Sequence, residues 1–337
     1  MAITAKELAK HLGLSEAAVS LALNDKPGVS TKTKKRVLEA AREFGYDFSR
    51  LSLNDSSVKE QGLIYFIIYK KNGAIVTDTP FFSQLSEGID LECKRLNYYL
   101  NILYIYEGED ISSHLKTLVQ VGAKGIILLG TEMQDVDILS FSQCPIPFVI
   151  LDTYFEHTTA DYVLINNVQG AYVATDYLIK KTHTQPGYLR SSYSINNFDE
   201  RADGFYKAIR KNGMATSRSI VHRLSPSIEG AYADMKQLLS QNEQLATCYF
   251  ADNDLIAIGA MRALQEHGYK MPTDISIIGF DDTPLCTYIN PPLTTIHVPK
   301  EYMGQMAVRR IHEKITALQN TYVKIEVSTN LIKRKST

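Results

Sequence analysis

The chain has 337 residues, which is too long for one small core and fits a small domain followed by a larger body. Apolar residues make up 45% of the chain and the formal net charge is −1, which indicates a globular protein and excludes one that is basic throughout. The N-terminus has no apolar signal segment, and no stretch approaches the roughly eighteen apolar residues of a membrane span. We therefore expect a cytoplasmic protein with no membrane partner.

The four cysteines are widely spaced, at Cys93, Cys144, Cys248 and Cys286. No pair has CxxC spacing, and none has a histidine nearby at the spacing of metal ligands. We expect small buried side chains in a reducing compartment, and neither a metal nor a cofactor.

Residues 3–24 predict two short helices joined by a tight turn. Thr4 and Glu7 have the spacing of a capping box, which fixes the start of the first helix. Gly13 supplies the turn, where a Cβ would be costly, and Ser15 caps the second helix. The segment therefore predicts a helix–turn–helix unit.

A third helix is predicted to begin after Ser30 and to end near Arg42 or Glu43. In this arrangement the second helix enters the major groove of DNA, although an ordinary helical hairpin gives the same pattern. Residues 1–50 carry a net charge of about +3, which leaves about −4 for the rest. A modestly basic end on an acidic body fits phosphate contact confined to one module, but a charge of this size also occurs on ordinary solvated surfaces.

Residues 47–61 are polar and lack a strong period, so we expect a linker. Beyond it, apolar runs of strand length alternate with helical periods in two successive series, which predicts two α/β lobes with parallel sheets. Strands are predicted at 63–69, 100–106, 125–129, 147–151, from 162, and at 187–189, 220–223, 247–250 and 275–280. Helices are predicted at 82–96, 112–121, 168–180, 200–210, 231–239 and 254–266.

Ligands of open α/β sheets bind at the carboxyl ends of the strands, and two facing lobes form a cleft there. The segments that follow the predicted strands are therefore the site candidates. They are 77–82, 130–132, 152–154, 190–194, 252–254 and 281–282.

From Thr4 to Tyr46 the chain resembles the DNA-binding headpiece of the LacI/GalR family of bacterial transcriptional regulators. The matching residues are Thr4, Leu8, Ala9, Gly13, Leu14, Ser15, Val19, Ser20, Leu23, Asn24, Val29, Ser30, Thr33, Arg36, Val37, Gly45 and Tyr46. The body resembles the ligand-binding core of the same family at Arg201, Gly204–Phe205, Ala208, Asn253–Asp254, Gly268–Pro272, Asp274–Ser276, Gly279–Asp282, Pro292–Ile296 and Thr329–Thr337.

The resemblance implies an all-α helix-turn-helix headpiece plus an α/β body like that of periplasmic sugar-binding proteins, with two doubly wound parallel-sheet lobes and three crossings between them. The domains expected are the headpiece at 1–46, a hinge at 47–61, an N-terminal lobe at 62–161 plus 295–322, and a C-terminal lobe at 162–294 plus 323–337. The function implied is a sequence-specific DNA-binding repressor that acts as a homodimer on a double-stranded operator. A small effector, a sugar or sugar phosphate, is expected between the lobes.

The residues expected at DNA also follow from the resemblance. Phosphate or backbone positions are Thr4, Ser15, Asn24, Thr33 and Tyr46, and the exposed face of the recognition helix carries Glu16, Ala17, Ser20 and Leu21. Relatives often have arginine where this chain has Leu21, which offers only apolar contact. The hinge also departs from the family pattern, because Asp55 aligns with the position of a leucine wedge. Two alternatives stay open: Leu51 or Leu53 serves after a shift in register, or the DNA is kinked in a different way.

Six residues are expected to hold the effector. Arg201 and Asp254 match family positions that hydrogen-bond the ligand, Asp152 and Asp282 are second candidates, and Phe81 and Phe82 are placed to stack on a sugar ring. Ordinary lobe core is the alternative for the phenylalanines. For Asp254 the alternative is an acid that stabilises the dipole of its helix.

Three other functions are compared with this reading of the residues. An enzyme is not expected, because GxSxG, GxxxxGK[ST], HExxH and GxGxxG are all missing and the eight histidines are scattered. A regulator controlled by a protein partner, such as a phosphorylated sugar-transport carrier, remains an alternative. A sugar-binding transport protein is disfavoured, because it would carry a signal peptide and no headpiece.

Overall fold

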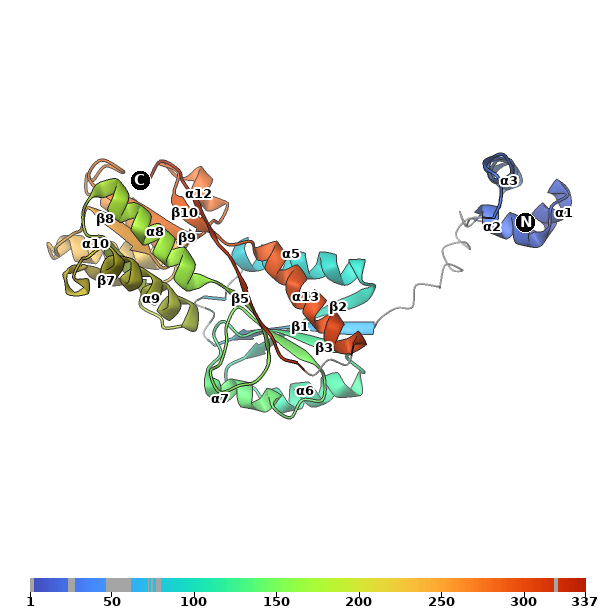
Figure 1. Cartoon of the computed structure of the whole chain (residues 1–337), viewed down its shortest axis with the longest axis horizontal. Coiled ribbons are helices and arrows are strands. Elements are labelled where there is room, and N and C mark those ends of the chain that lie inside the picture. Colours follow the sequence, from blue (N-terminus) through green and yellow to red (C-terminus); the bar gives the residue numbers. More distant parts are fainter. Residues whose placement is uncertain are drawn as a thin grey trace. The chain divides into compact units, whose positions relative to one another are not determined.

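The computed structural model describes residues 3–23, 28–46, 62–71, 73, 75–76, 80–317 and 321–337. The chain forms two compact units, Met1–Glu60 and Gln61–Thr337. Figure 1 shows the helical first unit and the α/β second unit. The predicted contacts of Asn24, Leu51, Leu53 and Asp55 lie outside the described residues.

The three predicted helices of the headpiece are confirmed as α1 (Ala5–Leu12), α2 (Glu16–Leu23) and α3 (Thr31–Glu43). Thr4 and Glu7 form the expected capping box, and its hydrogen bonds hold the pKa of Glu7 below its ordinary value. Gly13 ends α1 with φ +64°, the left-handed conformation that glycine adopts without strain. The core holds Leu8, Ala9, Val19, Ala22, Leu23, Val37, Ala40 and Ala41.

The first lobe of the body is a parallel six-stranded sheet with the order β11-β5-β4-β3-β1-β2. Its strands are β1 (Gly62–Lys70), β2 (Tyr98–Tyr106), β3 (Gly125–Leu129), β4 (Phe148–Leu151), β5 (Asp161–Ile165) and β11 (Lys324–Val327). Its helices are α5 (Pro80–Arg95), α6 (Ile111–Gln120), α7 (Asp135–Ile138) and α13 (Lys300–Thr316), with a 3-10 turn at Leu139–Phe141.

Alternation along β1 explains the layers of this lobe. Ile64 and Phe66 pack with α5 and α13, whereas Ile67 and Tyr69 pack with α6 and the turn after α7. Successive side chains of a strand point to opposite faces, so a strand covered on both faces reads as one continuous apolar run.

The second lobe has the order β12-β10-β9-β8-β6-β7, in which only β12 runs antiparallel. Its strands are β6 (Gly187–Ser191), β7 (Val221–Leu224), β8 (Cys248–Ala251), β9 (Ser276–Asp281), β10 (Thr294–His297) and β12 (Asn330–Ile332). Its helices are α8 (Asn167–Thr182), α9 (Asn196–Lys211), α10 (Ile228–Ser240), α11 (Asp254–Glu266) and α12 (Leu285–Tyr288), with a 3-10 turn at Thr216–Arg218.

The predicted lobe boundaries at 161, 295 and 322 need correction. β5 belongs to the first sheet and ends at residue 165, β10 pairs with β9 in the second sheet, and β11 pairs with β5 in the first. The chain therefore crosses between lobes after β5, after β10 and after β11. Periodicity identifies a strand but not the sheet that it joins, because non-local hydrogen bonds decide the pairing.

The helices α5 and α13 pack unusually closely on one face of the first lobe (Figure 1). A Cβ at Gly88 would lie 2.1 Å from the carbonyl oxygen of Glu301, and one at Gly304 would lie 2.4 Å from that of Leu85. The glycines thus fix α13 against α5, and the fixed helix begins at Lys300, beside the second lobe. In the described part of the chain, no helix combines the length and the apolar character needed to cross a membrane.

Candidate functional site

The second helix of the headpiece presents a polar and small-residue surface. Glu16, Ala17 and Ser20 are exposed on α2. The hydroxyl of Ser15 accepts a hydrogen bond from the N–H of Ala18 at 3.1 Å and so caps the helix. Nζ of Lys6 lies 3.9 Å from Oε1 of Glu16, and both side chains are well exposed.

Two further predicted DNA contacts support the third helix. The hydroxyls of Thr33 and Ser30 lie 2.8 Å apart, and Ser30 also accepts from the N–H of Thr33. The N–H of Tyr46 donates to the carbonyl of Ala41 at 2.8 Å, which closes the end of α3.

In the body, residues from both lobes line a narrow cavity that we call the inner pocket. About 40 Å³ of it is open to a water-sized molecule. Its described lining residues are Ile75, Phe81, Phe82, Thr131, Asp152, Ile195, Asn197, Phe198, Arg201, Pro226, Asn253, Leu255, Asp281 and Thr283. They gather at the carboxyl ends of the strands, as expected for an open α/β sheet.

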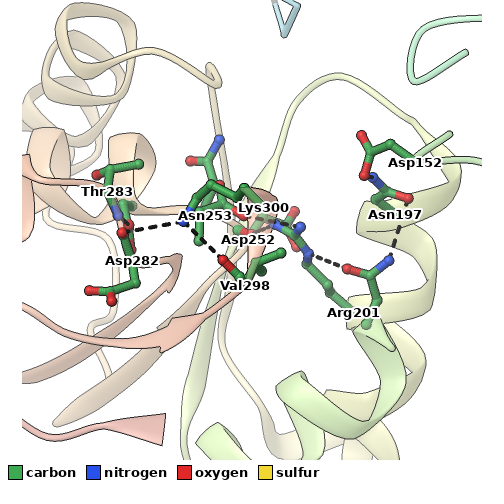
Figure 2. A network of polar contacts seen from close by, with 12 residues as sticks. Asp152, Asn197, Arg201, Asp252, Asn253, Asp282, Thr283, Val298 and Lys300 are labelled. Carbon is green, nitrogen blue, oxygen red and sulfur yellow. Dashed lines mark hydrogen bonds and ion pairs between the residues drawn. The ribbon is translucent and has the colours of Figure 1, made fainter. Parts of the chain in front are cut away.

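Arg201 is held from several sides in the inner pocket, and only 3% of it is exposed. Its Nε donates to Oδ1 of Asn167 at 2.9 Å, Nη1 donates to the carbonyl of Asp252, and Nη2 lies 3.2 Å from Oδ1 of Asp281. The guanidinium also lies over the ring of Phe280, 3.7 Å from its centroid. Figure 2 shows Arg201 within this network.

Asp152 faces Arg201 from the first lobe. Its Oδ2 accepts from the hydroxyl of Thr131 at 2.6 Å, and its Oδ1 accepts from Nδ2 of Asn197 at 3.0 Å, so the second contact joins the lobes (Figure 2). Burial raises the pKa of Asp152 to about 6, against the opposing effects of the Thr131 hydrogen bond and the charge of Arg201.

The strand ends at the inner pocket are conformationally strained. Among the described residues, six non-glycine residues have a positive φ, and Asp152 (+70°), Asp281 (+111°) and Asp282 (+55°) all lie at strand ends here. Non-glycine residues avoid this region, and such strain tends to collect at functional sites.

The two phenylalanines of α5 close one side of the inner pocket. Phe81 and Phe82 both line it, with ring centroids 5.0 Å apart in an edge-to-face arrangement. Phe81 also belongs to the core of the lobe and is 7% exposed. Phe81 therefore both lines the inner pocket and belongs to the core of the lobe.

A wider cavity of about 580 Å³ adjoins the inner pocket and shares Ile75 and Ile195 with it; we call it the outer cleft. Its described lining also includes Lys71, Glu132, Asp135 and Asp199. The outer cleft is therefore rich in carboxylates.

Comparison with known proteins agrees with this architecture. A model of bacterial regulatory proteins of the lacI family matches residues 4–48, and one of a periplasmic binding protein-like domain matches residues 175–337. The chain is 30% identical to the HTH-type transcriptional repressor PurR of Mannheimia succiniciproducens over 99% of this chain and 98% of the relative.

The chain belongs to the LacI family of bacterial transcriptional regulators. It is a DNA-binding regulator, and its headpiece and two-lobed body are those of the family.

Two solved LacI-family regulators, both with bound ribose, resemble the body. The regulator from Enterococcus faecium has a TM-score of 0.70 at 27% identity, over 80% of this chain and 98% of that one. The regulator from Enterococcus faecalis V583 has a TM-score of 0.68 at 28% identity, over 82% and 98%.

Two of the residues predicted to bind the effector do not line the inner pocket of this LacI-family chain. Both carboxylate oxygens of Asp254 are engaged elsewhere: Oδ1 accepts from the hydroxyl of Thr295 at 2.5 Å, and Oδ2 from the N–H of Thr283 at 2.8 Å. Burial and the charge of Asp281 raise the pKa of Asp254 to about 7. Asp254 thus ties α11 to the β9–β10 region.

Asp282 also points away from the inner pocket. Its Oδ1 accepts from Nη2 of Arg334 at 2.7 Å, and its Oδ2 lies 2.9 Å from Nδ1 of His297. The residues that do line the inner pocket are their neighbours Asn253 and Asp281. The predicted segments 252–254 and 281–282 thus reach the inner pocket through Asn253 and Asp281, because adjacent loop residues project in different directions.

Leu21 in the headpiece is half-buried rather than fully exposed. Its Cδ1 lies 3.1 Å from the position that a Cβ on Gly28 would take. The side chain of Leu21 therefore lies close to Gly28, and only part of it is available for contact with DNA.

Proposed function

We propose that a small sugar binds in the inner pocket and controls DNA binding by this repressor. The observation that carries the proposal is the placement of Arg201, held rigidly by three groups of the second lobe opposite Asp152 of the first. Paired charged groups that reach a ligand from both lobes suit the vicinal hydroxyls of a sugar. The ribose bound to the two Enterococcus relatives supports this class of ligand.

The remaining lining residues fit the same ligand. Asn197, Asn253, Thr131 and Thr283 offer amide and hydroxyl groups, while Phe82 offers an apolar ring surface. A few fixed polar groups in a mainly apolar cavity are the usual basis of specificity for small molecules. Asp254 and Asp282 act as positioning residues in this proposal, since they hold the loops that carry Asn253 and Asp281.

Ligand entry and lobe spacing are coupled in this proposal. The inner pocket has about 40 Å³ open to water, whereas ligand sites typically span several hundred Å³. A sugar therefore has to widen it, by moving side chains or by parting the lobes. A ligand that contacts both lobes favours one spacing, and it changes operator affinity only through its different affinity for the two states.

We infer that the regulator acts as a homodimer that pairs through the β2 edge of the first lobe. β2 is an edge strand of nine residues, and Ile102 and Tyr106 on it are each 50% exposed. Leu91 on the adjacent helix α5 is also 50% exposed. A long apolar edge is an aggregation hazard unless a partner covers it, and a second copy covers both edges at once.

On DNA, α2 is the proposed recognition helix. Glu16 accepts from cytosine N4 and Ala17 contacts a thymine methyl group, while Ser15, Thr33 and Tyr46 fix the position on the phosphates. Membership of a family of regulators supports a role in binding DNA. We also propose that the protein has no catalytic activity.

The experiment is a thermal-shift screen of the full-length protein against free sugars. We expect at least one sugar to raise the melting temperature, and Arg201→Ala to remove that shift. Arg210→Ala, an exposed arginine on the same helix, is the matched control and should respond normally. An undiminished shift in Arg201→Ala would place the effector elsewhere.

A further inference from the structure

We propose that the effector is an uncharged sugar or polyol, and that the cleft discriminates against sugar phosphates and other anions. This inference rests on the proposed function of the inner pocket. It follows from the balance of charge along the described lining of the inner pocket and of the outer cleft.

Within the described lining of the inner pocket, Arg201 is the one cation, and it faces two carboxylates, Asp152 and Asp281. Asp281 lies against the guanidinium, with Nη2 and Oδ1 3.2 Å apart. An anion bound to Arg201 would have to compete with Asp281 and would lie beside Asp152. Like charges brought together in a buried site repel strongly, since little water remains to screen them.

The guanidinium also has few donors left for a phosphate. Its Nε, Nη1 and Nη2 each donate within the protein, and one face of the group is covered by the ring of Phe280. A bidentate phosphate contact needs two parallel N–H groups that are free together. One or two single hydrogen bonds to sugar hydroxyls are less demanding.

Lys300 also acts on Asp281, but it does not alter this balance. It is 3% exposed, and its Nζ donates to the carbonyls of Val298 at 3.1 Å and Asp282 at 3.4 Å (Figure 2). Burial lowers the pKa of Lys300, against the opposing charges of Asp281 and Asp254. Asp254, Asp281 and Asp282 all act on Lys300, so counting Lys300 adds further carboxyl groups as well as one cation.

The N-terminus of α11, beside the inner pocket, already has protein acceptors. Helix N-termini commonly bind phosphate through their free N–H groups and dipole. At α11, Asn253 caps the helix by accepting from the N–H of Ile256 at 2.9 Å, and Asp254 places a carboxyl in the first turn. An incoming phosphate would meet protein acceptors at this helix end.

The outer cleft, which adjoins the inner pocket, has the same sign of charge. In the described lining of the outer cleft, Lys71 is the one cation, against Glu132, Asp135 and Asp199. Lys71 is itself 3.5 Å from Glu107, and Asp199 pairs with Arg190 at 2.6 Å. A cleft whose charged lining residues are mostly carboxylates lowers the local concentration of anions and leaves that of neutral sugars unchanged.

The test compares each free sugar with its own phosphate ester, for example ribose with ribose 5-phosphate and glucose with glucose 6-phosphate. Calorimetry on the full-length protein should show binding of at least one free sugar and at least 100-fold weaker binding of its ester. Affinity for the free sugar should not change between 50 and 500 mM NaCl, because no ionic contact to the ligand is screened.

Asp281→Asn tests the origin of the discrimination, and the melting temperature of the full-length variant without ligand checks that its body folds. We expect it to narrow the gap between free sugar and ester at least tenfold. If the wild-type protein bound an ester more tightly than the free sugar, the inference would be overturned. If Arg201→Ala then lost that ester binding, the proposed function of the inner pocket would still stand. Absence of binding by every sugar and every ester would contradict both.

Discussion

The carboxylate of Glu132 accepts a hydrogen bond from the backbone N–H of Ile75 at 2.9 Å, and Ile75 lines both the inner pocket and the outer cleft. The same carboxylate also accepts from the N–H groups of Lys71, Gly73 and Val76 at 2.7, 3.3 and 2.8 Å. One buried side chain thus holds four described residues after β1, among them Ile75 of the pocket lining.

Glu132→Gln should weaken effector binding although Glu132 is not placed against the ligand. Its amide presents N–H groups to backbone donors, so the loop loses some of its four hydrogen bonds, and each bond to a charged group is worth about 1.5–3 kcal/mol. We expect roughly a tenfold or greater loss of sugar affinity by calorimetry. Operator affinity without sugar should stay unchanged, as should both properties in the exposed control Glu243→Gln. Equal sugar affinity in the two variants would refute the role of this loop.

Sugar affinity should fall as the pH drops through about 6. Burial raises the pKa of Asp152 from 3.8 to about 6, so its carboxylate accepts hydroxyl donors at pH 7.5 and is largely protonated at pH 5. We expect the dissociation constant to rise by up to about tenfold per unit below pH 6. The same shift lowers the free energy of unfolding as the pH rises from about 4 to 6, because the native state binds this proton more tightly.

Asp152→Asn separates the effect of Asp152 on sugar affinity from that of Asp252. Burial also raises the pKa of Asp252 to about 6, but Asp252 does not line the inner pocket. The variant should bind the sugar more weakly with a flatter pH profile. A wild-type profile in Asp152→Asn would assign the pH dependence to another group.

Leu21→Arg should change the operator that the headpiece selects. Leucine cannot donate to guanine O6 and N7, whereas a bidentate arginine is worth about 1–3 kcal/mol for each base that it reads. Selection from randomised operators should yield guanine at one more position of each half-site. Because Leu21 leans towards Gly28, identical selections by both proteins would mean that residue 21 does not reach the groove.

Ile102→Lys should dissociate the dimer. A charge in the centre of the exposed β2 edge opposes its burial against a second copy, so sedimentation should shift from dimer towards monomer at micromolar concentration. Val136→Lys, which changes an exposed residue of α7, is the control and should remain dimeric. A dimeric Ile102→Lys would place the interface elsewhere.

The sequence predicted most elements of the body up to residue 280, because strands such as β3 and β5 are buried on both faces and read as uninterrupted apolar runs. It did not predict the helix α13 or the strand β11. Some observed element boundaries differ from the predicted ones, because a neighbouring residue type extends the helix or strand. α5 begins at Pro80 rather than Phe82, since proline suits the first turn of a helix. The sheet joined by β10 and β11 depends on non-local pairing, which periodicity does not record.

The predicted site segments reach the inner pocket, but the residues that line it are not all the ones predicted to hold the effector. Strand ends pointed to 252–254 and 281–282, yet Asn253 and Asp281 line the inner pocket while Asp254 and Asp282 brace its loops. The outcome depends on backbone angles such as φ +111° at Asp281, which the residue type alone does not predict. The loop-holding role of Glu132 was also missed, since its partners are backbone N–H groups that no sequence motif marks.

The most direct test of sugar control measures operator affinity by fluorescence anisotropy, on an operator selected with the full-length protein. The sugar that raises the melting temperature should change the wild-type dissociation constant by at least fivefold, within the usual range of allosteric coupling. Arg201→Ala should bind the same operator with the wild-type affinity in the absence of sugar and should show no change when sugar is added. An equal response to sugar in Arg201→Ala and in wild type would contradict control through the inner pocket.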